Sequence, residues 1–198
     1  MEPLKNQVRL DGMPALLPHA RRVARRASDL RGYFVDDAAL EALIRRDNPV
    51  IYEVFEPSVP EAPGQIMYGI TVLYPGRVGR EYFMTKGHYH ARRKTAEVYY
   101  GLDGQGRLVL QSEDGRSHVD DLEPGTVIYV PPGWAHRSVN VGVRPLVFLY
   151  AFPAEAGHDY AAIAQHGFAK LVVDQGGTAA VVDRSSWLAV PSRDHRMR

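Results

Sequence analysis

Four side chains of types that commonly bind metal ions stand in a pattern in the second and third quarters of the sequence. His88 and His90 are two residues apart, and Glu97 follows His90 after six intervening residues. His136 comes much later, directly after a Pro-Pro-Gly-Trp-Ala run. Residues i and i+2 of a β-strand face the same way, so an extended segment would place both imidazoles on one face. The pattern predicts a metal ion bound by His88, His90, Glu97 and His136.

The composition restricts the kind of ion and excludes several other chemistries. The chain has no cysteine, which excludes disulfides, thiolate-bound metals, iron–sulfur clusters and a cysteine nucleophile. Histidine and carboxylate ligands suit Fe, Mn, Ni or Zn, and such a set leaves positions open on an octahedral ion for water or substrate oxygen. The remaining histidines that we interpret as ordinary polar residues are His19, His118, His166 and His195.

Length, composition and charge predict a soluble protein. The chain has 198 residues, 45% of them apolar, and a formal net charge of +1. One domain is the default at this length, and the balanced charge gives no sign of a nucleic-acid partner. No apolar run approaches the ~20 residues of a membrane span, so we expect no membrane partner and a cytoplasmic location. An arginine cluster near the start predicts a solvated face; it contains Arg21, Arg22, Arg25, Arg26 and Arg31.

The elements that must position the four ligands are mostly strands. Residues 36–47 predict one short helix, because apolar residues recur at helical spacing between Asp36 and the Asn48-Pro49 pair. After it come short β-branched and aromatic runs separated by Gly and Pro turns, which favours an antiparallel sandwich or barrel. The expected strands cover residues 50–55, 66–74, 96–100, 107–111, 126–130, 146–150, 168–173 and 178–182, with a helical turn at 160–166.

The strand pattern also predicts how the ligands meet. Glu97, Tyr99 and Gly101 share one face of their strand, and a hairpin would place Glu97 opposite the two histidines. His136 begins a further strand after its Pro-Pro-Gly turn.

Extended motifs around these ligands resemble a known family. The second cupin motif is matched by Gly125-x5-Pro131-x-Gly133-x2-His136-x3-Asn140, and the first by His88-x-His90 with Glu97-x6-Gly104. Tyr82 replaces the usual glycine of the first motif, and six residues separate His90 from Glu97 where three or four are usual. With Thr85-Lys86-Gly87 ahead of the histidines and Tyr99 after Glu97, residues 50–165 resemble the archaeal-type cupin glucose-6-phosphate isomerase family.

The resemblance implies an all-β cupin fold, a double-stranded β-helix or jelly-roll barrel with a few short helices. It implies a single domain over residues 1–198, with an N-terminal extension of about residues 1–48 packed on the barrel. It further implies one divalent ion per chain, Fe²⁺ first and Mn²⁺, Ni²⁺ or Zn²⁺ as alternatives, and a homodimer, for which residues 50–55 offer an apolar strand.

The implied activity is interconversion of glucose 6-phosphate and fructose 6-phosphate, an aldose–ketose isomerisation used in glycolysis and gluconeogenesis. Glu97 and His158 would be catalytic. Glu97 would either leave the ion to act as a base or relay hydroxyl protons beside a hydride shift. The resemblance places the sugar phosphate against Tyr52, Thr71, Thr85, Gly87, Tyr99 and Tyr160.

Several of these positions have plainer interpretations. Tyr52 and Thr71 fit ordinary strand residues, Tyr99 fits a core tyrosine, and His158 fits a loop histidine. Phe152 stands where a family tyrosine would offer a hydroxyl group. For the whole chain, a cupin dioxygenase and a non-catalytic sugar-binding cupin are the alternative functions.

Overall fold

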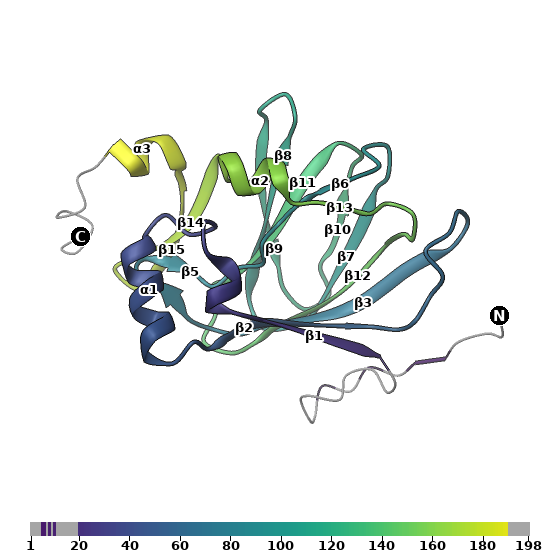
Figure 1. Cartoon of the computed structure of the whole chain (residues 1–198), viewed down its shortest axis with the longest axis horizontal. Helices are drawn as coiled ribbons and strands as arrows, with labels where there is room; N and C mark the ends of the chain where they lie inside the picture. The colour runs from purple at the N-terminus through teal and green to yellow at the C-terminus, as the bar shows by residue number, and fades with distance from the viewer. Residues whose placement is uncertain (1–4, 7, 9, 11–19, 190–198) are drawn as a thin grey trace.

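The computed structural model describes residues 5–6, 8, 10 and 20–189, and its main feature is a barrel of antiparallel strands (Figure 1). One side is a six-stranded sheet with the order β1-β2-β3-β12-β7-β10. Its strands are β1 (Arg21–Arg26), β2 (Val50–Glu56), β3 (Ile66–Leu73), β7 (Glu97–Asp103), β10 (Val127–Val130) and β12 (Leu146–Pro153).

The opposite side is assembled from shorter pieces. A three-stranded sheet contains β8 (Gly106–Ser112), β9 (Ser117–Leu122) and β11 (Trp134–Asn140). The pair β6 (Tyr89–His90) and β13 (His158–Asp159) lies beside it, because His88 forms an isolated bridge with His136 of β11. The last sheet contains β4 (Arg77–Val78), β5 (Glu81–Tyr82), β14 (Lys170–Gln175) and β15 (Thr178–Asp183).

The hydrophobic core lies between these layers. Alternate residues of the strands point inward, so Leu108, Leu122, Leu146 and Phe148 are all almost completely buried. Fully burying side chains of this size contributes roughly 1.5–3 kcal/mol each to the free energy of unfolding. The predicted all-β cupin fold, a jelly-roll barrel, is confirmed.

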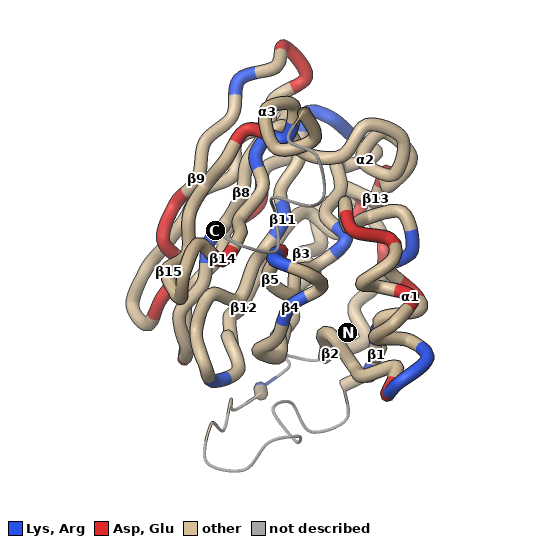
Figure 2. The backbone as a smooth tube through the Cα atoms, turned by 90° about the vertical axis from the view of Figure 1, so that its left-hand side faces the viewer, with Lys and Arg blue, Asp and Glu red and all other residues tan. Residues whose placement is uncertain are grey.

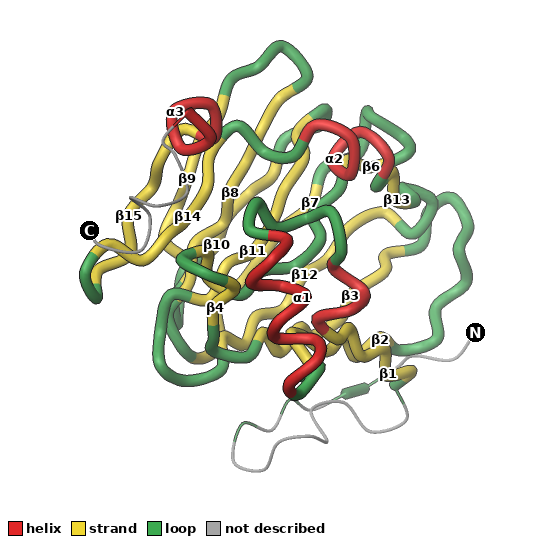
Figure 3. Tube along the Cα trace, turned by 60° about the vertical axis from the view of Figure 1, so that its left-hand side comes forward, coloured by secondary structure: helices red, strands yellow, loops and turns green. Residues whose placement is uncertain are grey.

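Helices are few and lie outside the barrel (Figure 3). They are the 3₁₀ helix η1 (Ala27–Leu30) and the α-helices α1 (Asp37–Arg46), α2 (Ala161–His166) and α3 (Arg184–Ala189). The predicted helix is confirmed as α1: Asp36 caps it by accepting a hydrogen bond from the Ala39 N–H at 2.9 Å, and Leu40 and Leu43 are buried. No helix within the described residues is long and apolar enough to cross a membrane.

The arginine cluster forms a strand that the sequence did not predict. β1 pairs with β2, bringing Arg21 opposite Glu56 and Arg25 opposite Tyr52. The strand lacks alternating apolar residues, and ion pairs support it instead, with Arg21 bound to Glu56 and Arg22 to Glu53. Figure 2 shows acidic and basic residues interspersed along the described backbone. Because β1 covers one edge of β2 and β3 the other, residues 50–55 offer no free edge to a partner.

The predicted hairpin between the histidines and Glu97 is wrong. β6 pairs with β13, whereas β7 lies between β12 and β10 in the other sheet. The turn between β6 and β7 crosses the barrel, and Arg93 holds it by donating hydrogen bonds at 2.6 Å to both Glu113 and Asp159. Arg93 is therefore an anchor of that crossing.

Candidate active site

The four candidate ligands come from both sides of the barrel and meet inside it. Their ligand atoms all lie within 4.8 Å of one another. Glu97 begins β7 in the large sheet, while His90 ends β6 and His136 lies in β11 on the opposite side. The bridge between His88 and His136 fixes the last pair, with ring centroids 4.5 Å apart.

Hydrogen bonds orient one of these imidazoles as a ligand. Nδ1 of His90 lies 3.1 Å from the Thr95 carbonyl oxygen, to which it donates when it carries the ring proton. In that tautomer Nε2 of His90 is an acceptor, and it lies 3.0 Å from Oε2 of Glu97. A neutral imidazole nitrogen and a carboxylate oxygen both present lone pairs to each other, an arrangement that a cation between them stabilises.

The other imidazoles supply further buried lone pairs. Nε2 of His136 lies 3.0 Å from Oε2 of Glu97, but the two atoms are not aligned for a hydrogen bond. Nε2 of His88 and both ring nitrogens of His136 are buried and have no hydrogen-bond partner among the described residues. Buried polar atoms are nearly always paired, so unpaired nitrogens converging on one carboxylate fit a bound divalent metal ion.

Electrostatics keeps the ligands in the protonation states that a metal needs. Burial acts to raise the pKa of Glu97, but contacts with His136 and His90 outweigh it and set that pKa at about 2. Burial, and then the neighbouring His136, His158 and His90, lowers the pKa of His88 well below its usual value. Glu97 is therefore an anion and His88 a neutral imidazole at neutral pH.

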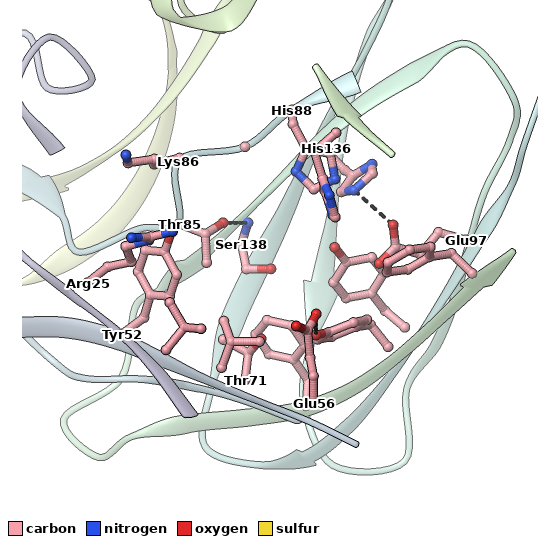
Figure 4. Close-up of a pocket in the computed structure, with 18 of the residues that line it drawn as sticks. Arg25, Tyr52, Glu56, Thr71, Thr85, Lys86, His88, Glu97, His136 and Ser138 are labelled. Atoms are coloured by element: carbon pink, nitrogen blue, oxygen red, sulfur yellow. Dashed lines mark hydrogen bonds and ion pairs between the residues drawn. The ribbon is translucent and has the colours of Figure 1, made fainter. Parts of the chain in front are cut away.

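A pocket of about 200 Å³ opens beside this cluster (Figure 4). His88, Glu97 and His136 line it, whereas His90 lies behind them. Every residue that the resemblance assigned to the sugar phosphate lines the same pocket, and so does the candidate catalytic His158: Tyr52, Thr71, Thr85, Gly87, Tyr99, His158 and Tyr160.

One side of the pocket is basic and rich in donors. Figure 4 shows Arg25, Tyr52, Thr85 and Lys86 together, opposite His88, His136 and Glu97. Burial raises the pKa of Tyr52, while hydrogen bonds to its oxygen from the Lys86 N–H and the Arg25 side chain act the other way. Burial and then the charge of Arg25 lower the pKa of Lys86, as expected where two cations share a site.

Gly87 lies at the turn between this basic side and the metal ligands. Its φ of +71° is in the left-handed region, and a Cβ there would come within 2.6 Å of Phe168 and 2.9 Å of the His136 carbonyl oxygen. Buried Arg137 donates to the Lys86 carbonyl oxygen at 2.7 Å. Since a peptide group is planar and trans, this bond directs the Gly87 N–H away from Arg137.

His158 and Tyr160 cover the metal ligands from the third side. The His158 ring lies 4.3 Å from the His88 ring and stacks on Tyr160 at 5.8 Å. Burial lowers the pKa of His158, although Glu97 acts to raise it. β13 pairs His158 with His90, so this histidine lies in a short strand and lines the pocket.

Sequence reasoning missed other residues of the pocket. Arg21, Arg25, Glu56, Ser138 and Tyr150 line it and were not predicted as site residues. Arg21, Arg25 and Glu56 line the pocket because β1 pairs with β2. A cluster of arginines in the sequence does not reveal that pairing. Phe152 lies 5.6 Å from the His90 ring and contributes only an apolar wall.

Two further histidines, His118 and His166, lie among the described residues and do not belong to the cluster. His118 contacts Asp120 on exposed β9, and His166 ends α2. His19 and His195 lie outside the described residues.

The first prediction concerns metal retention. His136→Ala removes a ligand, so we expect the purified variant, loaded with Mn²⁺ and dialysed, to retain well under half of the metal that the unmodified chain keeps. Elemental analysis of metal per chain measures this, with His118→Ala as the control that loses an exposed histidine. Equal metal content in the two variants would contradict the proposed ligand set.

Comparison with known proteins identifies the family. A family model described as glucose-6-phosphate isomerase (GPI) matches residues 24–186. Glucose-6-phosphate isomerase of Thermococcus gammatolerans is 51% identical over 180 residues, covering 91% of this chain and 95% of the relative. The protein of the same name from Sinorhizobium medicae is 43% identical, covering 82% and 78%.

Among solved structures, oxalate oxidase in complex with the substrate analogue glycolate matches 59% of this chain and 58% of its own, at 18% identity and a TM-score of 0.48. The family model covers every residue of the candidate metal cluster and every pocket residue except Arg21 and Val23. The chain therefore belongs to the glucose-6-phosphate isomerase family.

Proposed function

We propose that this protein is a metal-dependent aldose–ketose isomerase that interconverts glucose 6-phosphate and fructose 6-phosphate. The observation that carries the proposal is the convergence of three imidazoles and one carboxylate on a pocket whose opposite side is basic. The names of the relatives supply glucose 6-phosphate as a substrate, and aldose–ketose isomerisation converts it to fructose 6-phosphate. A divalent ion held by His88, His90, Glu97 and His136 would supply Lewis acidity to the carbonyl and hydroxyl oxygens of the open-chain sugar.

The net reaction is a balanced transfer within one molecule. From aldose to ketose, the C2–H bond breaks, a C1–H bond forms, and a proton moves from the oxygen on C2 to the oxygen on C1. No outside oxidant or base is consumed, so the protein needs only to orient the two carbons and to handle the hydroxyl protons.

Two groups at the metal end of the pocket, one of them a proposed ligand, are suited to handle those protons. His158 is neutral at neutral pH because burial lowers its pKa, so it can accept a hydroxyl proton and return it. Glu97 is an anion that accepts a hydrogen bond from the Tyr99 hydroxyl, which limits the freedom of its carboxylate. We assign the proton relay to His158 and Glu97, with Tyr99 positioning the latter.

The basic side of the pocket would bind the phosphate. Arg25 and Lys86 offer charge, while Tyr52, Thr71 and Thr85 offer hydroxyl groups. A phosphate dianion gains most from charged donors in a partly enclosed site. With the phosphate bound on the basic side, C1 and C2 at the other end of the sugar would lie at the metal ligands.

The assay that tests this proposal uses glucose 6-phosphate and fructose 6-phosphate in both directions. We expect turnover by protein loaded with Fe²⁺, Mn²⁺ or Ni²⁺, loss of turnover with a chelator, and recovery when metal is restored. Absence of turnover after loading with all three metals would sink the proposal. Oxygen uptake with aromatic substrates, or ligand-induced stabilisation without conversion, would favour a dioxygenase or a sugar-binding cupin.

A second prediction addresses the phosphate end. Arg25→Gln removes one charged donor, so we expect KM for both hexose phosphates to rise about tenfold, the lower limit for a hydrogen bond to a charged group, with kcat within about twofold. Arg26→Gln is the matched control, since Arg26 is the next residue of β1, is exposed and bonds to the Asn48 carbonyl oxygen. If both variants keep the KM of the unmodified chain, Arg25 does not bind phosphate.

We also propose that the protein is a homodimer through the outer face of β7 and β10. Val98 and Tyr100 on β7 lie opposite Tyr129 and Val127 on β10, and all four side chains are exposed, Val127 by 65%. β10 is also the last strand of its sheet, and apolar edge strands of this kind are usually covered.

Light scattering tests the dimer. We expect the unmodified chain to have the mass of two 22.1 kDa chains and Tyr129→Lys to have the mass of one, because a charge would be buried without a partner. Val181→Lys on β15, also exposed, is the control that should remain dimeric. Tyr129→Lys with unchanged mass would rule out this face as the interface.

A further inference from the structure

We propose that Glu56 and Tyr150 form a binding site for the hydroxyl groups of the sugar chain and thereby set the substrate's orientation in the pocket. The inference rests on the proposed function, since it assumes that a sugar phosphate occupies this space. Neither residue belongs to the metal cluster or to the basic side.

The two side chains are joined inside the pocket. The Tyr150 hydroxyl donates to Oε1 of Glu56 at 2.7 Å, and Nη2 of Arg21 donates to Oε2 at 2.7 Å. All three residues line the pocket, with the Glu56 side chain 15% exposed and Tyr150 6% exposed. Figure 4 shows Glu56 low in the view, apart from Arg25 and Lys86.

This arrangement leaves acceptors directed at a ligand. Because the Tyr150 proton goes to Glu56, the lone pairs of the Tyr150 oxygen are available to a donor. A carboxylate has about four acceptor sites, and Tyr150 and Arg21 use two of those on Glu56. Free acceptors on both groups match a row of neutral hydroxyl donors, which an open-chain sugar provides.

Charge also decides which part of the substrate this pair would bind. Glu56 is paired with Arg21, so this end of the pocket offers no surplus positive charge to a phosphate dianion. Arg25 and Lys86 favour that dianion on their own side. The phosphate and the hydroxyl groups therefore have separate places, and the reacting carbons are held at the metal ligands.

The fold provides a specific place for the Tyr150 hydroxyl. β12 pairs Tyr150 with Gly69 of β3 on one side and with Tyr99 of β7 on the other. A Cβ at position 69 would come within 2.4 Å of the Tyr150 oxygen, so only glycine leaves room for it. Phe152 is two residues further along the same face and its ring lies parallel to Tyr150 at 5.8 Å, but it has no hydroxyl. Tyr150 thus gives this wall of the pocket its polar group.

The chain contains a matched pair that serves as a control. Tyr74 donates to Oε2 of Glu53 at 2.8 Å, and Arg22 pairs with the same carboxylate. This second Arg–Glu–Tyr group does not line the pocket. Tyr74→Phe therefore removes the same kind of hydrogen bond as Tyr150→Phe without touching the proposed site.

The test measures binding directly, by calorimetry on metal-loaded protein with glucitol 6-phosphate and with inorganic phosphate. Both ligands carry phosphate, but only glucitol 6-phosphate carries the hydroxyl chain. We expect Tyr150→Phe to raise Kd for glucitol 6-phosphate about fivefold, the effect of one neutral hydrogen bond, and to leave Kd for inorganic phosphate unchanged. Glu56→Gln should weaken the same ligand selectively, whereas Tyr74→Phe should change neither Kd.

Two outcomes would overturn the inference. Unchanged binding of glucitol 6-phosphate by Tyr150→Phe would show that the hydroxyl makes no contact with the sugar chain. Equal weakening of both ligands, accompanied by loss of metal or a lowered Tm, would show that the pair is only structural. The proposed function fails separately, by absence of turnover in the unmodified chain, because calorimetry does not depend on turnover.

Discussion

A buried carboxylate surrounded by imidazole nitrogens is the constraint on which the rest of this structure depends. Glu97 is an anion in the barrel interior, and its oxygen lies 3.0 Å from Nε2 of both His90 and His136. Burying a charge is costly unless it is paired, and facing lone pairs repel, so a cation bound among these groups removes both penalties. Because Glu97 comes from the six-stranded sheet and the histidines from the opposite side of the barrel, a metal ion bound by all four would favour closure of the barrel.

The same barrel gives the pocket three chemically different sides. The register of β1 against β2 brings Arg25 to Tyr52 at one end and Arg21 to Glu56 at the other, while β12 brings Tyr150 beside Tyr99 and hence close to Glu97. A ligand with a charged end, a hydroxyl chain and a reactive carbonyl can satisfy all three sides in only one orientation. Such ordering is what isomerisation of a flexible sugar requires, since most of its barrier reduction comes from orientation and electrostatics.

The elements that could be predicted from the sequence are those that depend on residues close together in the chain. The helix was readable from Asp36 and the spacing of Leu40 and Leu43, and the main strands from their apolar runs. The ligand set was readable because the His88–His90 spacing and the turn before His136 are local motifs. Two features were out of reach because they depend on long-range pairing. β1 is held by carboxylates about 30 residues away, and the crossing between β6 and β7 depends on Arg93 reaching Asp159. The same dependence hid Arg25, Glu56 and Tyr150.

We propose that His88, His90, Glu97 and His136 together bind one divalent ion. Diffraction from crystals of the Mn²⁺- or Fe²⁺-loaded protein, recorded on both sides of the metal's absorption edge, tests this most directly. We expect a single anomalous peak per chain, about 2.0–2.2 Å from the ligating nitrogen and oxygen atoms. A peak elsewhere, or a cluster in which Glu97 remains bonded only to the imidazoles with no metal peak, would contradict it.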